Sequence, residues 1–197
     1  MNQNKIWTTK KLTITAILSA TSFILAFIEF PIPLSPSFAR MDISDFPALI
    51  GSFAFGPIIG LLIELIKNIL QLFSSSTAGI GELANFLIGS SFVVSAGFIY
   101  KQNQTKKTAI VACMVSSLVM GIVAALTNYY ILLPLFETFM PLDQLVDSFH
   151  QFLPFIHTKL DIVLYNAFPF NLLKGLCISI ITICIYKHLT PILKGKN

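Results

Sequence analysis

Lys174 lies deep inside the last apolar stretch of the chain, in the run Pro169-Phe170-Asn171-Leu172-Leu173-Lys174-Gly175. A charged side chain near the bilayer centre costs from about 2.5 to more than 10 kcal/mol, so such residues usually face a cavity or a bundle interior. An ammonium group only donates hydrogen bonds, whereas the amide of Asn171, on the same helical face, both donates and accepts. The two residues predict a site for a polar ligand that carries acceptor atoms.

Other polar residues are expected at a similar depth. A count of about 1.5 Å per helical residue places Lys174 roughly 20 Å from Lys187, at the basic end of the same helix. The same count places Glu82, Asn85 and Asn128 in the outer half of the bilayer. Asp45 begins the predicted second helix, directly after the first outer loop, and so lies on the same side. Together with Asn171 and Lys174, they predict one outward-facing cavity.

Several of these residues also have a purely structural interpretation. Asn85 or Asn128 alone could form an interhelical hydrogen bond, and Asp45 could cap the N-terminus of a helix. Glu64 and Lys67, spaced i,i+3, predict an internal ion pair that neutralises itself. Lys174 differs, because no acid within its own helix could partner it.

The composition indicates an integral membrane protein. Of 197 residues, 55% are hydrophobic and only 11% are charged, mean hydropathy is +0.79, and the apolar residues come in long blocks. This length suits one membrane domain, residues 1–197, without an additional catalytic or nucleotide-binding domain. Three cysteines lie in apolar helices without metal-ligand spacing, so we interpret them as small apolar side chains and predict no metal site: Cys113, Cys177 and Cys184.

Six transmembrane helices are expected, at about residues 12–30, 45–55, 57–73, 81–100, 108–133 and 160–189. The prolines of Pro31-Ile32-Pro33-Leu34-Ser35-Pro36 should end the first helix, and Gly56-Pro57 should separate the second from the third. The second helix covers only about 16 Å, half a bilayer. Pro134 should end the fifth helix, and residues 137–157 should form an outer loop.

The net charge of +4 reflects membrane topology rather than nucleic-acid binding. Lysines flank the apolar blocks at the N-terminus, one central loop and the C-terminus: Lys5, Lys10, Lys11, Lys101, Lys106, Lys107, Lys187, Lys194 and Lys196. An even number of spans puts these three places on one side, which the positive-inside rule makes cytoplasmic. We therefore expect both termini in the cytoplasm, and no cleavable signal peptide.

The chain resembles the riboflavin-specific substrate-binding (S) components of energy-coupling factor (ECF) vitamin transporters. The resemblance covers nearly the whole chain and rests on the order and spacing of short motifs. These are Phe30-Pro31-Ile32-Pro33, Asp42-Ile43-Ser44-Asp45-Phe46-Pro47, Phe55-Gly56-Pro57, Lys67-Asn68, Ala84-Asn85-Phe86-Leu87, Asn128-Tyr129 with Leu132-Leu133-Pro134-Leu135, and Pro169-Phe170-Asn171 with Lys174-Gly175. Such proteins are six-helix bundles with cytoplasmic termini.

The resemblance implies a high-affinity riboflavin-binding subunit of an ATP-driven vitamin importer in the bacterial cell membrane, not an enzyme. It implies riboflavin as transported ligand, no cofactor, and as partners a membrane coupling protein with two cytoplasmic ATPases. Asn128, Asn171 and Lys174 are implied as ring contacts and Asp45 and Asn85 as pocket residues. The first outer loop, near Met41, and the third outer loop are implied to close over the ligand. Glu82 is added from its face and depth. Ala16 and Ala20 form the small-residue pattern of the implied docking surface.

Other functions remain open from the residues alone. An S component for another vitamin, such as thiamine or a folate, would share most of this pattern. An intramembrane enzyme could use Glu64, Glu82, His150 and His157, but the histidines fall in a predicted loop and no His-Glu-x-x-His spacing occurs. A solitary carrier driven by an ion gradient should show inverted repeats, which the chain lacks.

Overall fold

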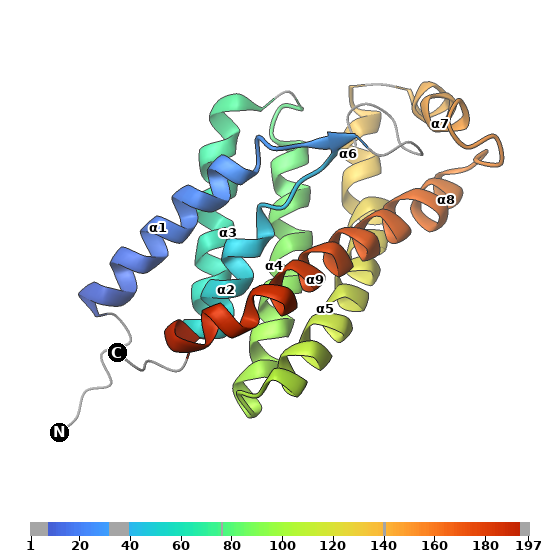
Figure 1. Cartoon of the computed structure of the whole chain (residues 1–197). Helices are drawn as coiled ribbons and strands as arrows, with labels where there is room; N and C mark the ends of the chain where they lie inside the picture. The colour runs from blue at the N-terminus through green and yellow to red at the C-terminus, as the bar shows by residue number, and fades with distance from the viewer. Residues whose placement is uncertain (1–7, 32–39, 76, 140, 194–197) are drawn as a thin grey trace.

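The protein is a helical bundle, seen here in a computed structural model that describes residues 8–31, 40–75, 77–139 and 141–193 (Figure 1). The helices are α1 Thr9–Leu25, α2 Asp45–Phe55, α3 Pro57–Gln71, α4 Ile80–Gln102, α5 Lys106–Thr127, α6 Leu133–Glu137, α7 Leu142–His150, α8 Lys159–Ile162 and α9 Phe168–Leu193. A 3-10 turn, η1 Leu72–Ser74, follows α3, and two π-helical segments, η2 Asn128–Leu132 and η3 Val163–Ala167, join α5 to α6 and α8 to α9. Helices α3 and α4 pack together, as do α4 with α5 and α5 with α9.

Within the described residues, four continuous helical stretches are long and apolar enough to cross a membrane, at Pro57–Ser74, Ile80–Gln102, Lys106–Glu137 and Lys159–Tyr186. Helix α2 is apolar but shorter, as the sequence predicted from its eleven residues. Its predicted bounds are confirmed, and Gly56 separates it from α3 at a φ of 101°, in the left-handed region that favours glycine. Pro57 follows at the first helical position, where its missing N–H costs nothing.

The first helix is shorter than predicted. It ends at Leu25 rather than near Phe30, and the chain then enters a short antiparallel ribbon of β1 Phe30–Pro31 and β2 Arg40–Met41. Proline disfavours helix in the residue before it, which explains why Phe30 is extended. The rest of the proline-rich stretch, with Pro33 and Pro36, lies outside the described residues.

Pro134 does not end the fifth helix, contrary to the prediction. The helical path continues to Glu137 through the π-helical segment η2, in which the Leu133 N–H donates to the Asn128 carbonyl, five residues back. Proline cannot continue a regular ladder of bonds to the fourth residue back, and the wider turn accommodates it. The same arrangement precedes Pro169, where the Phe168 N–H donates to the Val163 carbonyl.

The predicted outer loop of residues 137–157 contains a helix. Residues Leu142–His150 form α7, whose Leu145 and Phe149 are buried against a small apolar cluster with Leu133 and Ile162. The segment is less apolar than the membrane helices because only one face is covered.

The two ends of the bundle differ in charge. The start of α1, the turn between α4 and α5, and the end of α9 lie at one end, whereas the β-ribbon and α7 lie at the other (Figure 1). Lysines occupy the first end, at Lys10 and Lys11 of α1 and in the α4–α5 turn. Lys5, Lys194 and Lys196 lie outside the described residues.

Close helix contacts in the core depend on glycine. A Cβ at Gly97 of α4 would overlap Ser52 Oγ and lie 3.1 Å from Pro57 Cα. Ser52 is buried, and its Oγ donates to the Val93 carbonyl at 2.5 Å, so it cannot rotate away without losing this bond.

Gly97→Ala should therefore lower stability by about 1–3 kcal/mol, the usual cost of overpacking a core. The measurement is the thermal unfolding midpoint of the detergent-solubilised protein. Leu118→Ala, on the exposed face of α5, is the control and should leave the midpoint nearly unchanged. Equal midpoints for Gly97→Ala and the wild type would contradict the close approach.

Candidate functional site

A cavity of about 270 Å³ opens among the helices and is lined by five of the seven predicted ligand-contact residues. These are Glu82, Asn85, Asn128, Asn171 and Lys174. They come from α4, from η2 after α5, and from α9. The volume lies just below the range of about 300–1,000 Å³ typical of small-molecule sites. The depth count thus brought together residues that the structure places around one cavity.

Lys174 is almost fully buried and makes three polar contacts. Its Nζ lies 3.1 Å from Asp42 Oδ2, 3.2 Å from Asp45 Oδ2 and 3.2 Å from Asn85 Oδ1. A buried ammonium without partners would be very costly, and these acceptors from other elements compensate it. The sequence correctly excluded a partner within the same helix, but it did not identify Asp42.

Asp45 and Met41 are the two predicted residues outside the cavity lining. Asp45 is completely buried, and its carboxylate lies between two lysines, with Oδ1 at 2.6 Å from Lys67 Nζ and Oδ2 facing Lys174. Ser44, not Asp45, occupies the N-cap position of α2. Asp45 thus contacts the Lys174 ammonium without lining the cavity itself, and it holds that group in position. Met41 lies in β2, directly before Asp42.

The predicted ion pair between Glu64 and Lys67 is confirmed, at 2.7 Å between Glu64 Oε2 and Lys67 Nζ. This ion pair is not isolated, because Lys67 also contacts Asp45. The charged cluster in the described residues therefore joins three carboxylates to two ammonium groups: Asp42, Asp45 and Glu64 with Lys67 and Lys174. Removing one partner of such a network leaves an uncompensated buried charge.

Asn128 and Asn171 adopt matching conformations. The Nδ2 of Asn128 donates to the Ala124 carbonyl at 2.8 Å, and that of Asn171 to the Ala167 carbonyl at 2.9 Å. Each amide donates one N–H to its own helix, so its oxygen and second N–H are available to a ligand. Asn128 is the first residue of η2, and Asn171 donates to the last residue of η3; such π-helical segments are frequent at functional sites.

Glu82 lies in the first turn of α4. Its Oε2 accepts from Ser75 Oγ at 2.8 Å and from Thr77 Oγ1 at 3.4 Å, which ties the preceding loop to the helix. These two hydrogen bonds hold the Glu82 carboxylate in place in the cavity lining.

Sequence reasoning missed several residues of the lining. The polar ones are Glu29, Asp42, Gln71, Thr77 and Asn166, and the aromatic ones are Phe136, Phe149 and Phe170. Eighteen phenylalanines occur in the chain, and nothing in their spacing distinguishes these three. Asp42 had a usable signal, since it lies within the same short polar motif as Asp45.

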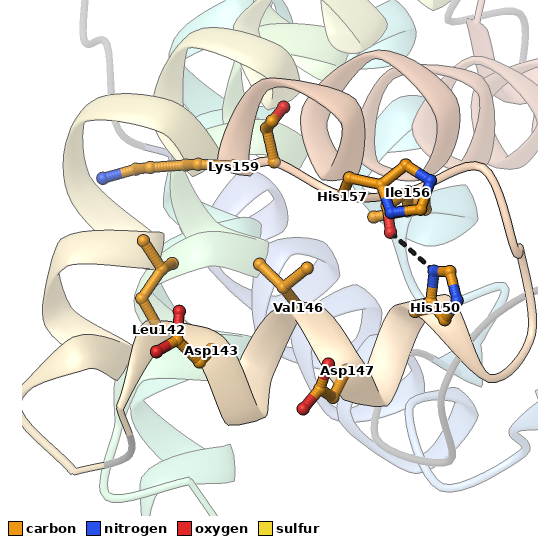
Figure 2. Close-up of a pocket in the computed structure, with 9 residues that line it drawn as sticks. Leu142, Asp143, Val146, Asp147, His150, Ile156, His157 and Lys159 are labelled. Carbon is orange, nitrogen blue, oxygen red and sulfur yellow. Dashed lines mark hydrogen bonds between the residues drawn. The ribbon is translucent and has the colours of Figure 1, made fainter.

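A second, larger pocket of about 590 Å³ lies between α7 and the start of α8 and shares no lining residue with the first (Figure 2). His150 Nδ1 lies 2.9 Å from the Ile156 carbonyl, and the rings of His150 and His157 are 4.9 Å apart between centroids. Asp147 points away from both rings (Figure 2). In the described residues no three His, Cys, Asp or Glu side chains are placed to hold a metal ion.

Comparisons with known proteins agree over nearly the whole chain. The family model for the substrate-specific component of ECF transporters matches residues 10–186. Riboflavin transporter RibU of Staphylococcus aureus (strain TCH60) is 37% identical over 194 residues, covering 98% of this chain and 95% of that protein. Riboflavin transporter FmnP of Bacillus subtilis (strain 168) is 32% identical over 185 residues, covering 92% and 93%.

A solved structure gives the same result for the fold. It is described as the S component of a bacterial ECF transporter, and it superposes with a TM-score of 0.76 at 36% sequence identity. The match covers 94% of this chain and 98% of that one.

Proposed function

Because the chain belongs to the family of substrate-specific components of ECF transporters, we propose that it is the riboflavin-binding membrane subunit of such a transporter. The observation that carries the proposal is the convergence of Asn85, Asn128, Asn171 and Lys174 on one cavity, in a chain similar to riboflavin transporters along nearly its full length. As a family member it is a transport component and not an enzyme.

The proposed contacts follow from the chemistry of the flavin ring. One edge of the isoalloxazine carries two carbonyl oxygens, acceptor ring nitrogens and one N–H donor. Lys174 donates to this edge, and the amides of Asn128 and Asn171 accept from its N–H and donate to its oxygens. Phe136, Phe149 and Phe170 supply apolar wall to the rest of the ring.

Lys174 must exchange one of its three partners for the ligand. Asp42 is the partner that yields in this proposal, because its side chain is 12% exposed whereas that of Asp45 is fully buried. Asp45 stays in place and holds the ammonium toward the cavity. Met41, next to Asp42, is assigned to the closure over the ligand.

The ribityl chain extends from the ring toward the cavity rim. Asn85 lies beside Lys174, and Glu82 lies about one helical turn further toward the start of α4. Both present acceptor oxygens suited to hydroxyl groups.

The bundle crosses the bacterial plasma membrane with six helices in this proposal, the lysine-rich end and both termini facing the cytoplasm. The lysines of the α1 start and the α4–α5 turn support this orientation. The cavity then opens at the opposite, external side, as an importer requires.

The partners in this proposal are a membrane coupling protein and two cytoplasmic ATPases. Helix α1 supplies a suitable docking face. Ala16 and Ala20 are exposed, whereas Thr15 and Ser19 are buried against the bundle. Small residues four apart let another helix approach closely.

Purification of the full chain from membranes of riboflavin-supplied cells tests the ligand. The preparation should be yellow, with a flavin absorption spectrum and about one flavin per protein. The matched control is the same preparation from cells supplied with thiamine and starved of riboflavin. A colourless protein that binds no added flavin, or one that retains thiamine instead, would contradict the proposal.

A further inference from the structure

We propose that helix α3 carries a sodium-binding site, formed by the side-chain oxygens of Glu64, Asn68 and Gln71 next to the buried charged cluster. These residues are spaced i, i+4 and i+7, which places their side chains on one face of the helix. The inference goes beyond the proposed function, because it concerns the protein without its vitamin.

Each of these three side chains has a buried oxygen atom without a hydrogen-bond partner in the described part of the chain. The atoms are Glu64 Oε1, Asn68 Oδ1 and Gln71 Oε1. Glu64 is fully buried and Asn68 is 4% exposed, so bulk water does not solvate them. A buried acceptor without a donor is costly, and more so when it is charged. Three such atoms along one helix face indicate a bound species that accepts their lone pairs.

The side chains of Glu64 and Asn68 are fixed by their other polar atoms. Asn68 Nδ2 lies 2.8 Å from the Glu64 carbonyl oxygen and 3.4 Å from Glu64 Oε2, and Glu64 Oε2 lies 2.7 Å from Lys67 Nζ. Neither side chain can rotate to find another partner without losing these contacts. The two remaining oxygens, Glu64 Oε1 and Asn68 Oδ1, are therefore preorganised acceptors.

The charge of the cluster points to a monovalent cation. Its three carboxylates and two ammonium groups leave an excess of one negative charge, in a region from which water is excluded. One Na⁺ would make the cluster neutral, whereas a divalent ion would give it an excess of positive charge. Carboxylate and carbonyl oxygens are the ligands that such hard cations prefer.

A proton or a water molecule would account for less. A proton could bind Glu64 Oε1, but the amide oxygens of Asn68 and Gln71 are not titratable side-chain groups and would stay without a partner. A water molecule can donate to two oxygens but brings no charge. A sodium ion accepts several oxygen ligands at once, and Gln71 lines the cavity, which gives the ion a path from the external side.

The packing of α4 against this face favours a small ion. A Cβ at Gly89 of α4 would lie 2.9 Å from Glu64 Oε2 and 3.2 Å from Asp45 Oδ1, so the two helices approach closely at the carboxylates. Na⁺ is smaller than K⁺, and we therefore assign the site to sodium.

The test measures the thermal unfolding midpoint of the detergent-purified, vitamin-free full chain while sodium chloride replaces choline chloride. Constant ionic strength keeps the screening of surface charges unchanged. Binding of Na⁺ to the folded protein should raise the midpoint and then saturate, with a total shift of at least about 2 °C. Potassium chloride should give a smaller shift.

Two variants locate the site. Glu64→Gln removes the charged ligand and keeps the shape of the side chain, and Gln71→Met removes an amide oxygen at a half-buried position that tolerates substitution. Both should lose most of the sodium-dependent shift, and Gln71→Met decides the matter if Glu64→Gln does not fold. The matched control is Glu137→Gln, whose acid pairs with Lys159 away from the cluster and which should keep the shift.

Equal midpoints in sodium and choline overturn the proposal, and so does an equal rise in potassium. A midpoint that responds to pH but not to sodium would assign a proton to Glu64 instead. A shift that both variants retain would place the ion elsewhere. Failure to bind riboflavin would overturn the proposed function alone, because the sodium measurement uses vitamin-free protein.

Discussion

Lys174→Ala is expected to weaken riboflavin binding by more than tenfold while leaving the protein folded. The substitution removes the donor that faces the acceptor edge of the flavin, a loss of more than about 1.4 kcal/mol of binding free energy. The dissociation constant of the detergent-purified variant, measured by fluorescence quenching, checks the prediction.

The fold should tolerate this change because both acids that contact Lys174 keep other partners. Asp45 retains Lys67 at 2.6 Å, and Asp42 Oδ1 still accepts from the Ser44 N–H at 2.8 Å. Lys159→Ala is the matched control, since it removes an outer lysine whose pair with Glu137 is partly exposed. An unchanged dissociation constant for Lys174→Ala would remove the lysine from the ligand contacts.

Lys67→Met should be the more damaging substitution for stability. The substitution leaves the carboxylates of Glu64 and Asp45 to repel each other in an environment from which water is excluded. Loss of one partner of a buried ion pair typically lowers the free energy of unfolding by about 3–5 kcal/mol. Thermal unfolding in detergent, or the fraction that elutes as a single species after extraction from membranes, reports the loss.

The double variant Lys67→Met with Glu64→Gln separates charge from packing. The single variant leaves three carboxylates and one ammonium in the cluster, whereas the double variant restores the wild-type excess of one negative charge. It should therefore recover part of the lost stability. A single variant as stable as the wild type would show that the cluster does not hold α2 against α3.

The features predicted most accurately from the sequence are those that depend on the spacing of residues close together in the chain. The break at Gly56 and Pro57 depends on the conformations available to two adjacent residues, and the pair of Glu64 and Lys67 depends on one helical turn. The gathering of polar side chains around the cavity followed from helix rise and membrane depth, which are nearly constant from one protein to another.

Features that depend on distant contacts were missed or wrong. The partner Asp42 lies 132 residues from Lys174 in sequence, and no local pattern relates two such positions. Helix α7 is only half covered by apolar neighbours, so its composition resembles that of a loop. The sequence predicts a helix end at Pro134 because proline interrupts the hydrogen bonds of a regular helix, but a wider turn accommodates it.

The wider turns at Asn128–Leu132 and Val163–Ala167 have an evolutionary consequence. Each holds one residue more than a regular turn, so each is a position where a single insertion or deletion leaves the helix intact. Deleting one residue from the second turn would turn it into a regular helical turn, and α9 would keep nearly the same orientation relative to what precedes it. Asn171 and Lys174 would then stay in the cavity, so a family member with a one-residue gap there is expected to keep the same two contacts with its ligand.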